Sequence, residues 1–224
     1  LAQALEKIRR AGHLPVHVTP TFQAMLSAAG AQISFPGRLA TQALQSPGLV
    51  SLAINRMKGP GRNFLNALTT NTISATMLEA GSKVNVIPSS AEVALDCRLV
   101  PGQTPEDVMR EIKAITGDQV ELEVVYASSG AAFSTETELY KIMQQATRKM
   151  DPEGIVIPMM MPGATDASQY QRAGMSIYGF TPGILPPELP IMTMAHGHDE
   201  RIPVSYIQSG LPVLWDVITQ FCGA

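Results

Sequence analysis

The alternation of apolar and polar residues predicts that residues 71–127 form strands around one helix. The segment 72–79 is rich in strand-forming residue types, and residues 92–100 place apolar side chains at every second position. Residues 104–117 combine a threonine cap, a proline at the first helical position, an apolar stripe and a final glycine, which predicts a helix. Renewed alternation at 120–124 predicts a closing strand.

The residues before this region are predicted to be helical. Apolar positions with helical spacing predict a helix at 2–11 that is closed by Gly12. Residues 13–70 form a helical insert in which prolines and glycines separate short helices. The insert either covers a core or presents an apolar surface toward lipid or substrate, and spacing alone leaves both interpretations open. The order helix, strand, strand, helix, strand describes a split βαβ, ferredoxin-like sandwich that lacks its first strand.

Helices and strands are predicted to alternate in the second half of the chain. Helical periodicity predicts helices at 139–150 and 166–173, and apolar runs predict strands at 155–161 and 175–180. A last helix is marked by the apolar residues Ile207, Leu211, Leu214, Ile218 and Phe221. Such alternation is typical of a parallel sheet covered by helices, so the predicted fold class is α/β.

A hinge of small residues at 128–132 separates the two patterns. It divides the chain into domains at 1–127 and 128–224.

Composition narrows the possible functions. The 224 residues are 45% hydrophobic and 16% charged, as in a globular protein, and the formal net charge is −3. Without a run of Lys or Arg, nucleic acid is not an expected partner, and no apolar stretch approaches the ~20 residues of a membrane span. Cys97 and Cys222 are interpreted as buried free thiols in a reducing, cytoplasmic compartment. Because the chain opens within a helical pattern, further residues are expected before Leu1.

The segment 196–200 is the best candidate for metal chemistry. It contains His196 and His198, two of the four histidines of the chain, together with Asp199 and Glu200, just before the last helix. One metal needs three or four ligands, so the histidines alone are also compatible with a pair of solvated loop residues. The sequence contains no Gly-x-Ser-x-Gly elbow, no P-loop and no dinucleotide-binding glycine motif.

Several short motifs occur together in a fixed order. They are Asn85-Val86-Ile87-Pro88, Arg98 thirteen residues after Asn85, Thr104-Pro105-Glu106-Asp107, Ala164-Thr165-Asp166, and His196-Gly197-His198-Asp199-Glu200. In this combination the chain resembles the zinc aminoacylase and carboxypeptidase family, which includes carboxypeptidase G, acetylornithine deacetylase and succinyl-diaminopimelate desuccinylase. The helical insert further resembles the carboxypeptidase S-like and N-acyl amino acid hydrolase branch.

The resemblance implies roles for individual residues. His196 corresponds to a zinc ligand, whereas His198 falls on a variable position and is given a supporting role. Asn85 and Arg98 correspond to residues that hold the carboxylate and amide of the substrate, a task that suits the planar fork of arginine. Ala164 corresponds to a backbone N–H contact to the substrate. Judged on the residues alone, Arg98 is also explained as an ion-pair partner of Asp96, and Asn85 as a turn residue.

The resemblance also implies an architecture and an activity. Residues 1–127 correspond to a lid and dimerisation domain, and residues 128–224 to the C-terminal part of an α/β metallohydrolase domain. The implied reaction is hydrolysis of the amide bond of N-acyl amino acids or peptides with a free carboxylate, by a homodimer with two zinc ions per subunit. The remaining zinc ligands and the general base precede the sandwich in the family, so the segment is expected to be inactive alone. The alternative is a non-catalytic dimerisation or binding module with a vestigial metal site.

Overall fold

The computed structural model describes residues 1–31, 33–128, 130–161, 163, 165–189, 191–194 and 197–223. The chain forms two compact units. The first contains Leu1–Ala131 and Met159–Ser168, and the second contains Ala132–Pro158 and Gln169–Ala224. The domain boundary after residue 127 remains a prediction.

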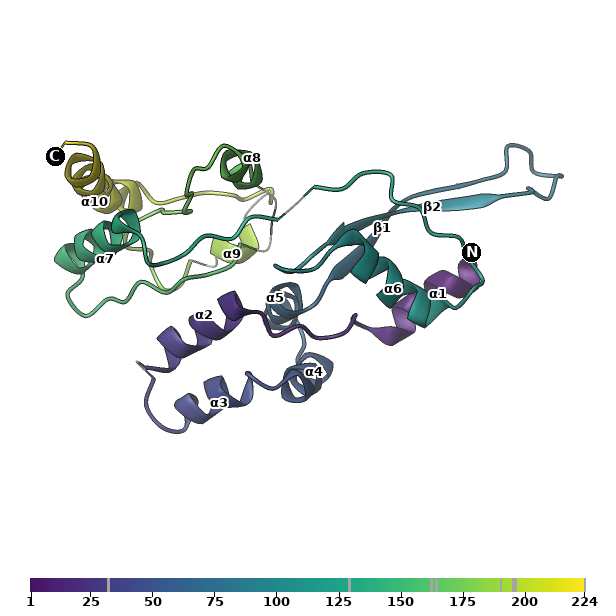
Figure 1. The fold of residues 1–224 in the computed structure, drawn as a ribbon, viewed down its shortest axis with the longest axis horizontal. Coiled ribbons are helices and arrows are strands. Elements are labelled where there is room, and N and C mark those ends of the chain that lie inside the picture. The colour runs from purple at the N-terminus through teal and green to yellow at the C-terminus, as the bar shows by residue number, and fades with distance from the viewer. Residues whose placement is uncertain are drawn as a thin grey trace. The chain divides into compact units, whose positions relative to one another are not determined.

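The first unit is built on a hairpin that packs against two helices (Figure 1). Strands β1 (Thr72–Ala80) and β2 (Ala91–Arg98) pair antiparallel, with a bulge between Ala75 and Met77. Helices α1 (Ala2–Ala11) and α6 (Pro105–Thr116) contribute to the same apolar core. This core contains Ile8, Leu14, Ile73, Leu95, Cys97, Leu99, Val108 and Ile112. The predicted apolar face of β2 is therefore confirmed.

Helix α6 begins and ends at the residues that the sequence predicts. Thr104 Oγ1 accepts a hydrogen bond from the Asp107 backbone N–H at 3.3 Å, and Asp107 Oδ2 accepts one from the Thr104 N–H at 2.9 Å. The hydrogen bonds that the backbone N–H and the hydroxyl of Thr104 donate to the Asp107 carboxylate hold the pKa of Asp107 below its usual value. Gly117 ends the helix at a φ of 70°, a conformation that favours glycine.

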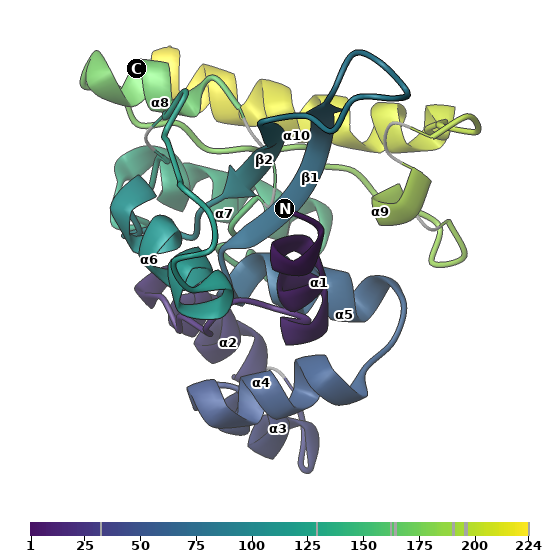
Figure 2. The same ribbon diagram turned by 90° about the vertical axis from the view of Figure 1, so that its right-hand side faces the viewer.

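The region of the helical insert is a set of short helices with its own core, which lie together in Figure 2. Its helices are α2 (Pro20–Gly30), α3 (Gly37–Ala43), α4 (Pro47–Arg56) and α5 (Pro60–Thr69). Prolines in the first turn start α2, α4 and α5, where the missing N–H has no helical partner to lose. The buried residues Phe22, Leu26, Val50, Ile54 and Leu68 form the core. A bridge between Val16 and Thr70 joins the start and the end of the insert.

The second unit is held together by two long helices. Helices α7 (Glu138–Met150) and α10 (Val204–Cys222) pack against each other, and the shorter α8 (Ala167–Arg172) and α9 (Ile191–Met194) lie between them in the chain. The buried residues shared by α7 and α10 are Tyr140, Ile142, Met143, Ala146, Val213 and Val217. Lys149 Nζ and Asp216 Oδ2 add an ion pair at 2.7 Å. None of the helices in the described residues is long and apolar enough to cross a lipid bilayer.

Several predicted features of the fold are wrong. Residues 120–124, 155–161 and 175–180 are not strands, and the β1–β2 hairpin is the only sheet in the described part of the chain. Their apolar side chains still reach a core, as Leu122, Val156, Tyr178 and Phe180 show. A strand also needs neighbouring strands for its backbone hydrogen bonds, and the described residues provide none there. The parallel sheet is therefore not found.

The buried face of the last helix is not predicted from the sequence, and the prediction for the cysteines needs correction. The apolar residues that mark the last helix, Ile207, Leu211, Leu214, Ile218 and Phe221, are exposed, because α7 covers the face that carries Val213 and Val217. Cys97 is half-buried, and burial raises the pKa of its thiol. Cys222 is exposed rather than buried.

Candidate functional site

Arg98 lies at the end of β2, where it pairs with Thr72 of β1. Its side chain is 54% exposed, and its Nε donates a hydrogen bond to Asp96 Oδ2 at 2.9 Å. Exposed ion pairs of this kind contribute about 0–1 kcal/mol. The guanidinium can therefore leave Asp96 for the carboxylate of a ligand at little cost.

Asn85 lies in the exposed connection between the two strands, beyond the last pair of the ladder, Ala80 and Ala91. Eight residue steps separate Thr72 from Ala80, and at ~3.3 Å per residue they span about 26 Å. Asn85 and Arg98 therefore lie at opposite ends of the hairpin, which projects past α1 and α6 (Figure 1). One hairpin does not bring both residues to the same small molecule.

The other two predicted site residues, Ala164 and His196, lie outside the described residues. Next to Ala164, the Thr165 Oγ1 accepts a hydrogen bond from the Ala167 backbone N–H at 3.3 Å. After His196, residues 197–200 are exposed. Within the described ranges, no group of three His, Cys, Asp or Glu side chains is placed to hold a metal ion. These residues alone therefore do not fit a zinc site.

A buried polar network was not predicted from the sequence. Asn71 is 1% exposed; its Oδ1 accepts a hydrogen bond from the Val100 backbone N–H at 3.1 Å, and its Nδ2 donates to Glu111 Oε2 at 3.0 Å. His17 Nε2 lies 2.6 Å from the other carboxylate oxygen of Glu111. The network therefore connects His17 near the start of the insert, and Asn71 just after its end, to Glu111 on α6. Asn71 also connects to Val100, which follows β2. Its members are separated by up to 94 positions in the chain, so no local sequence motif predicts the network.

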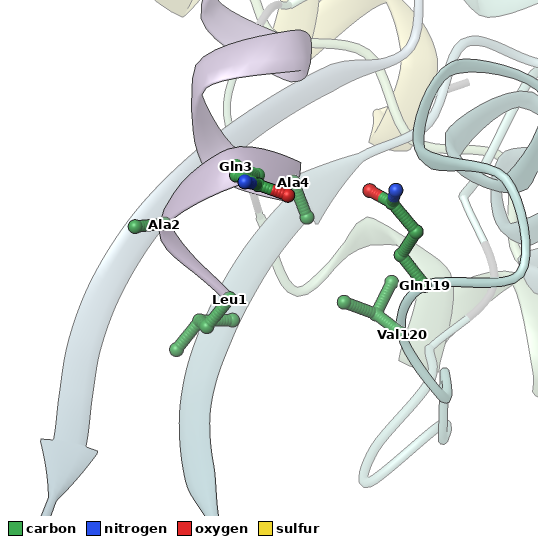
Figure 3. A pocket seen from close by; sticks show the side chains of 6 residues that line it. All are labelled: Leu1, Ala2, Gln3, Ala4, Gln119 and Val120. Carbon is green, nitrogen blue, oxygen red and sulfur yellow. The ribbon is translucent and has the colours of Figure 1, made fainter.

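The chain start forms a hollow of about 450 Å³ in the first unit. Figure 3 shows the residues that line it, Leu1, Ala2, Gln3 and Ala4 on one side and Gln119 and Val120 on the other. Their side chains include no titratable group. This hollow therefore offers no acid or base for catalysis.

Residues 2–121 match the peptidase dimerisation domain of the M20 family, which is more than half of the chain. The chain belongs to the M20 family of peptidases. The resemblance inferred from the motifs is thereby confirmed. The matched residues include the helical insert, the β1–β2 hairpin and helices α1 and α6 of the first unit.

Individual M20 relatives narrow the comparison. The chain is 31% identical to the mouse N-fatty-acyl-amino acid synthase/hydrolase PM20D1 over 158 residues, which cover 68% of this chain and 31% of the mouse protein. It is 29% identical to the probable carboxypeptidase S-like 2 of Dictyostelium discoideum over 143 residues, 62% of this chain and 27% of that protein. Acetylornithine deacetylase of Myxococcus xanthus is 24% identical over 160 residues, 68% of this chain and 38% of that enzyme.

The chain spans about a third of the length of the curated M20 relatives that it matches. No solved structure matches it. Activity, substrate and partners of the whole protein are therefore matters of proposal.

Proposed function

We propose that the chain is part of a metal-dependent M20 amidohydrolase that cleaves the amide bond of N-acyl amino acids or of peptides with a free carboxylate. The observation that carries this proposal is Arg98, an exposed guanidinium with one weak partner in a matched M20 dimerisation domain. Its planar fork suits a carboxylate, which is the group that such substrates share. The name of the mouse relative, an N-fatty-acyl-amino acid synthase/hydrolase, supports the same substrate class.

Zinc belongs to this proposal as a cofactor of the whole protein, with His196 as one ligand and the Ala164 backbone as a substrate contact. A catalytic zinc needs about three protein ligands. Because the described residues do not supply them, the 224-residue chain alone should hydrolyse no N-acyl amino acid.

The geometry of the hairpin supports a homodimer as part of this proposal. Asn85 and Arg98 both have a proposed role at the substrate, yet they lie at opposite ends of one hairpin. Two subunits in antiparallel contact can bring Asn85 of one chain to Arg98 of the other. The exposed apolar residues of the distal hairpin, Met77, Leu78, Val84, Val86 and Ile87, offer a surface for that contact.

Replacing Arg98 in the whole protein tests the proposed substrate. Arg98→Ala removes a charge-assisted pair of roughly 2–5 kcal/mol, so kcat/KM for carboxylate substrates should fall about thirtyfold or more. Arg98→Lys should recover only part of the loss, because an ammonium lacks the fork. A substrate with the carboxylate converted to an amide should be poor and nearly insensitive to the mutation.

Arg110→Ala is the matched control. Arg110 is also an exposed arginine with one carboxylate partner, Asp107, at 3.0 Å. Arg110→Ala should leave kcat/KM unchanged. In both variants the free energy of unfolding should stay within about 1 kcal/mol of that of the unmodified protein. If Arg98→Ala lowers kcat/KM equally for acid and amide substrates, Arg98 pairs only with Asp96 and does not bind the substrate carboxylate.

A non-catalytic dimerisation or binding module is the second candidate, since the matched region is itself a dimerisation domain. The gene sequence before Leu1 separates the two. A His-x-Asp and a Glu-Glu pair upstream would support the enzyme, and their absence would support the module.

A further inference from the structure

The helical insert contains an apolar groove of about 630 Å³. Helices α2 to α5 all contribute to it, and its wall includes Met25, Leu44, Leu49, Leu52, Met57 and Phe64. The insert core lies beneath, since the buried Phe22, Leu26 and Leu68 also line the groove. Pockets for small molecules have about the same size, roughly 300–1,000 Å³, and are mostly apolar.

Several large apolar side chains that line the groove are exposed to solvent. Leu52 is 44% exposed, and Leu49 and Met57 are similarly exposed, although their neighbours Val50 and Ile54 on α4 are completely buried. Helix α4 therefore has one face on the core and one face on the open groove. Contiguous exposed apolar surface of this kind marks a binding site more often than a structural need.

The charge of the insert favours an anionic ligand. Residues 7–78 contain no Asp or Glu, although the chain has 19 acidic residues. The insert instead carries Arg38, Arg56, Lys58 and Arg62, and Arg56 lines the groove. Arg56 has no ion-pair partner within the part of the chain that the structure describes. A positive field around an apolar groove attracts an anion with a hydrocarbon chain.

The groove also lies close to the proposed carboxylate site. Leu68, which lines the groove, precedes Thr72 by four residues, and Thr72 is the strand partner of Arg98. Four residues span at most about 14 Å. A molecule whose carboxylate contacts Arg98 can therefore place a long hydrocarbon chain in the groove.

We infer that the groove binds the acyl chain of a long-chain N-acyl amino acid whose carboxylate is held at Arg98. This inference rests on the proposed function and adds to it a length preference for the acyl group and a location for that group. The helices of the insert therefore form their own core and also bind the acyl group of the substrate.

Calorimetric titration of the 224-residue chain with N-acyl glycines, from acetyl to hexadecanoyl and below their micelle concentrations, tests the groove. Affinity should rise roughly three- to fourfold per methylene over the middle of the series, as expected for burial of hydrocarbon. Leu52→Glu should weaken hexadecanoyl-glycine binding at least tenfold. The matched control is Leu39→Glu on α3, where the leucine is 52% exposed but does not line the groove, and it should leave binding unchanged.

The inference is overturned if affinity does not depend on chain length, or if the two glutamate variants behave alike. It is equally overturned if the chain binds phosphatidylglycerol vesicles but no monomeric N-acyl glycine, since the surface then docks on a membrane.

Hydrolysis by the whole protein separates this inference from the proposed function. If acetyl-glycine and hexadecanoyl-glycine are both cleaved and Leu52→Glu affects neither, the groove assignment fails and the function stands. If neither is cleaved while the chain binds according to length, the function fails and the groove stands.

Discussion

Asn71 directly follows the helical insert, and its side chain links this point of the chain to Val100 after β2 and to Glu111 on α6. It is almost completely buried, and its two amide atoms are bonded to Val100 and Glu111. Asn71→Ala leaves the buried Val100 N–H without an acceptor, which should lower the free energy of unfolding of the first unit by about 1–3 kcal/mol. Hydrogen exchange followed by NMR should show faster exchange at the Val100 amide.

Asn63→Ala is the control, because Asn63 is exposed on α5 and alanine favours a helix. This variant should be neutral or slightly stabilising. Unchanged protection of Val100 in Asn71→Ala would mean that a water molecule or another group replaces the amide.

At the scale of elements, the packing of α10 depends on the absence of a side chain at Gly210. A Cβ at this position would lie 1.7 Å from the Pro182 carbonyl oxygen and 2.8 Å from its carbonyl carbon, which are backbone atoms. Gly210→Ala should therefore cost about 1–3 kcal/mol through overpacking, which outweighs the ~1 kcal/mol that alanine adds to a helix. Trp215, the single tryptophan, lies on α10 and reports the unfolding of the second unit by its fluorescence.

Gly48→Ala on α4 is the comparison for this variant. A Cβ at Gly48 meets nothing closer than the Ser46 Oγ at 4.0 Å. It should be neutral or stabilising when unfolding is followed by far-UV circular dichroism. A Gly210→Ala protein as stable as the unmodified chain would show that the 182–183 segment moves aside freely.

The elements differ in how far the sequence predicts them. Helix α6 and the β1–β2 hairpin follow from local signals, since the Thr104 cap, Gly117 and the alternation of β2 act within a few residues. The strand predicted at 175–180 fails because apolar character predicts burial, whereas a strand also needs hydrogen-bond partners from distant residues. Helix α10 is predicted from its local periodicity, but its buried face is not. Val213 is buried because α7 packs against that face, and α7 lies far away in the sequence.

Site prediction has the same limit. The roles of Asn85 and Arg98 are predicted from the family resemblance of their motif, but the distance between the two residues depends on the strand register. The His17–Glu111 pair depends on a contact across 94 positions.

At the scale of the whole molecule, mixed dimers test whether Asn85 and Arg98 act from different subunits. Whole proteins carrying Asn85→Ala or Arg98→Ala should each be nearly inactive. If the residues of one site come from two chains, each mixed dimer has one intact site and one doubly mutated site, so mixing should restore activity. Copurification with two affinity tags isolates the mixed dimer for the assay.

Mixing either variant with itself is the control and should restore nothing. Inactive mixed dimers would place both residues of a site on one chain, contrary to the register of the hairpin.

The bridge between Val16 and Thr70 has a consequence for how such a protein can change over evolutionary time. The backbone N–H of His17 donates to the Thr69 carbonyl at 2.6 Å, so the insert begins and ends at neighbouring points of the first unit. Loss or gain of everything between these points requires only a short connecting turn, and the entropy of closing a loop changes slowly with its length. Helices α2 to α5 can therefore be lost or exchanged as one segment, while the β1–β2 hairpin and helices α1 and α6 keep their own core.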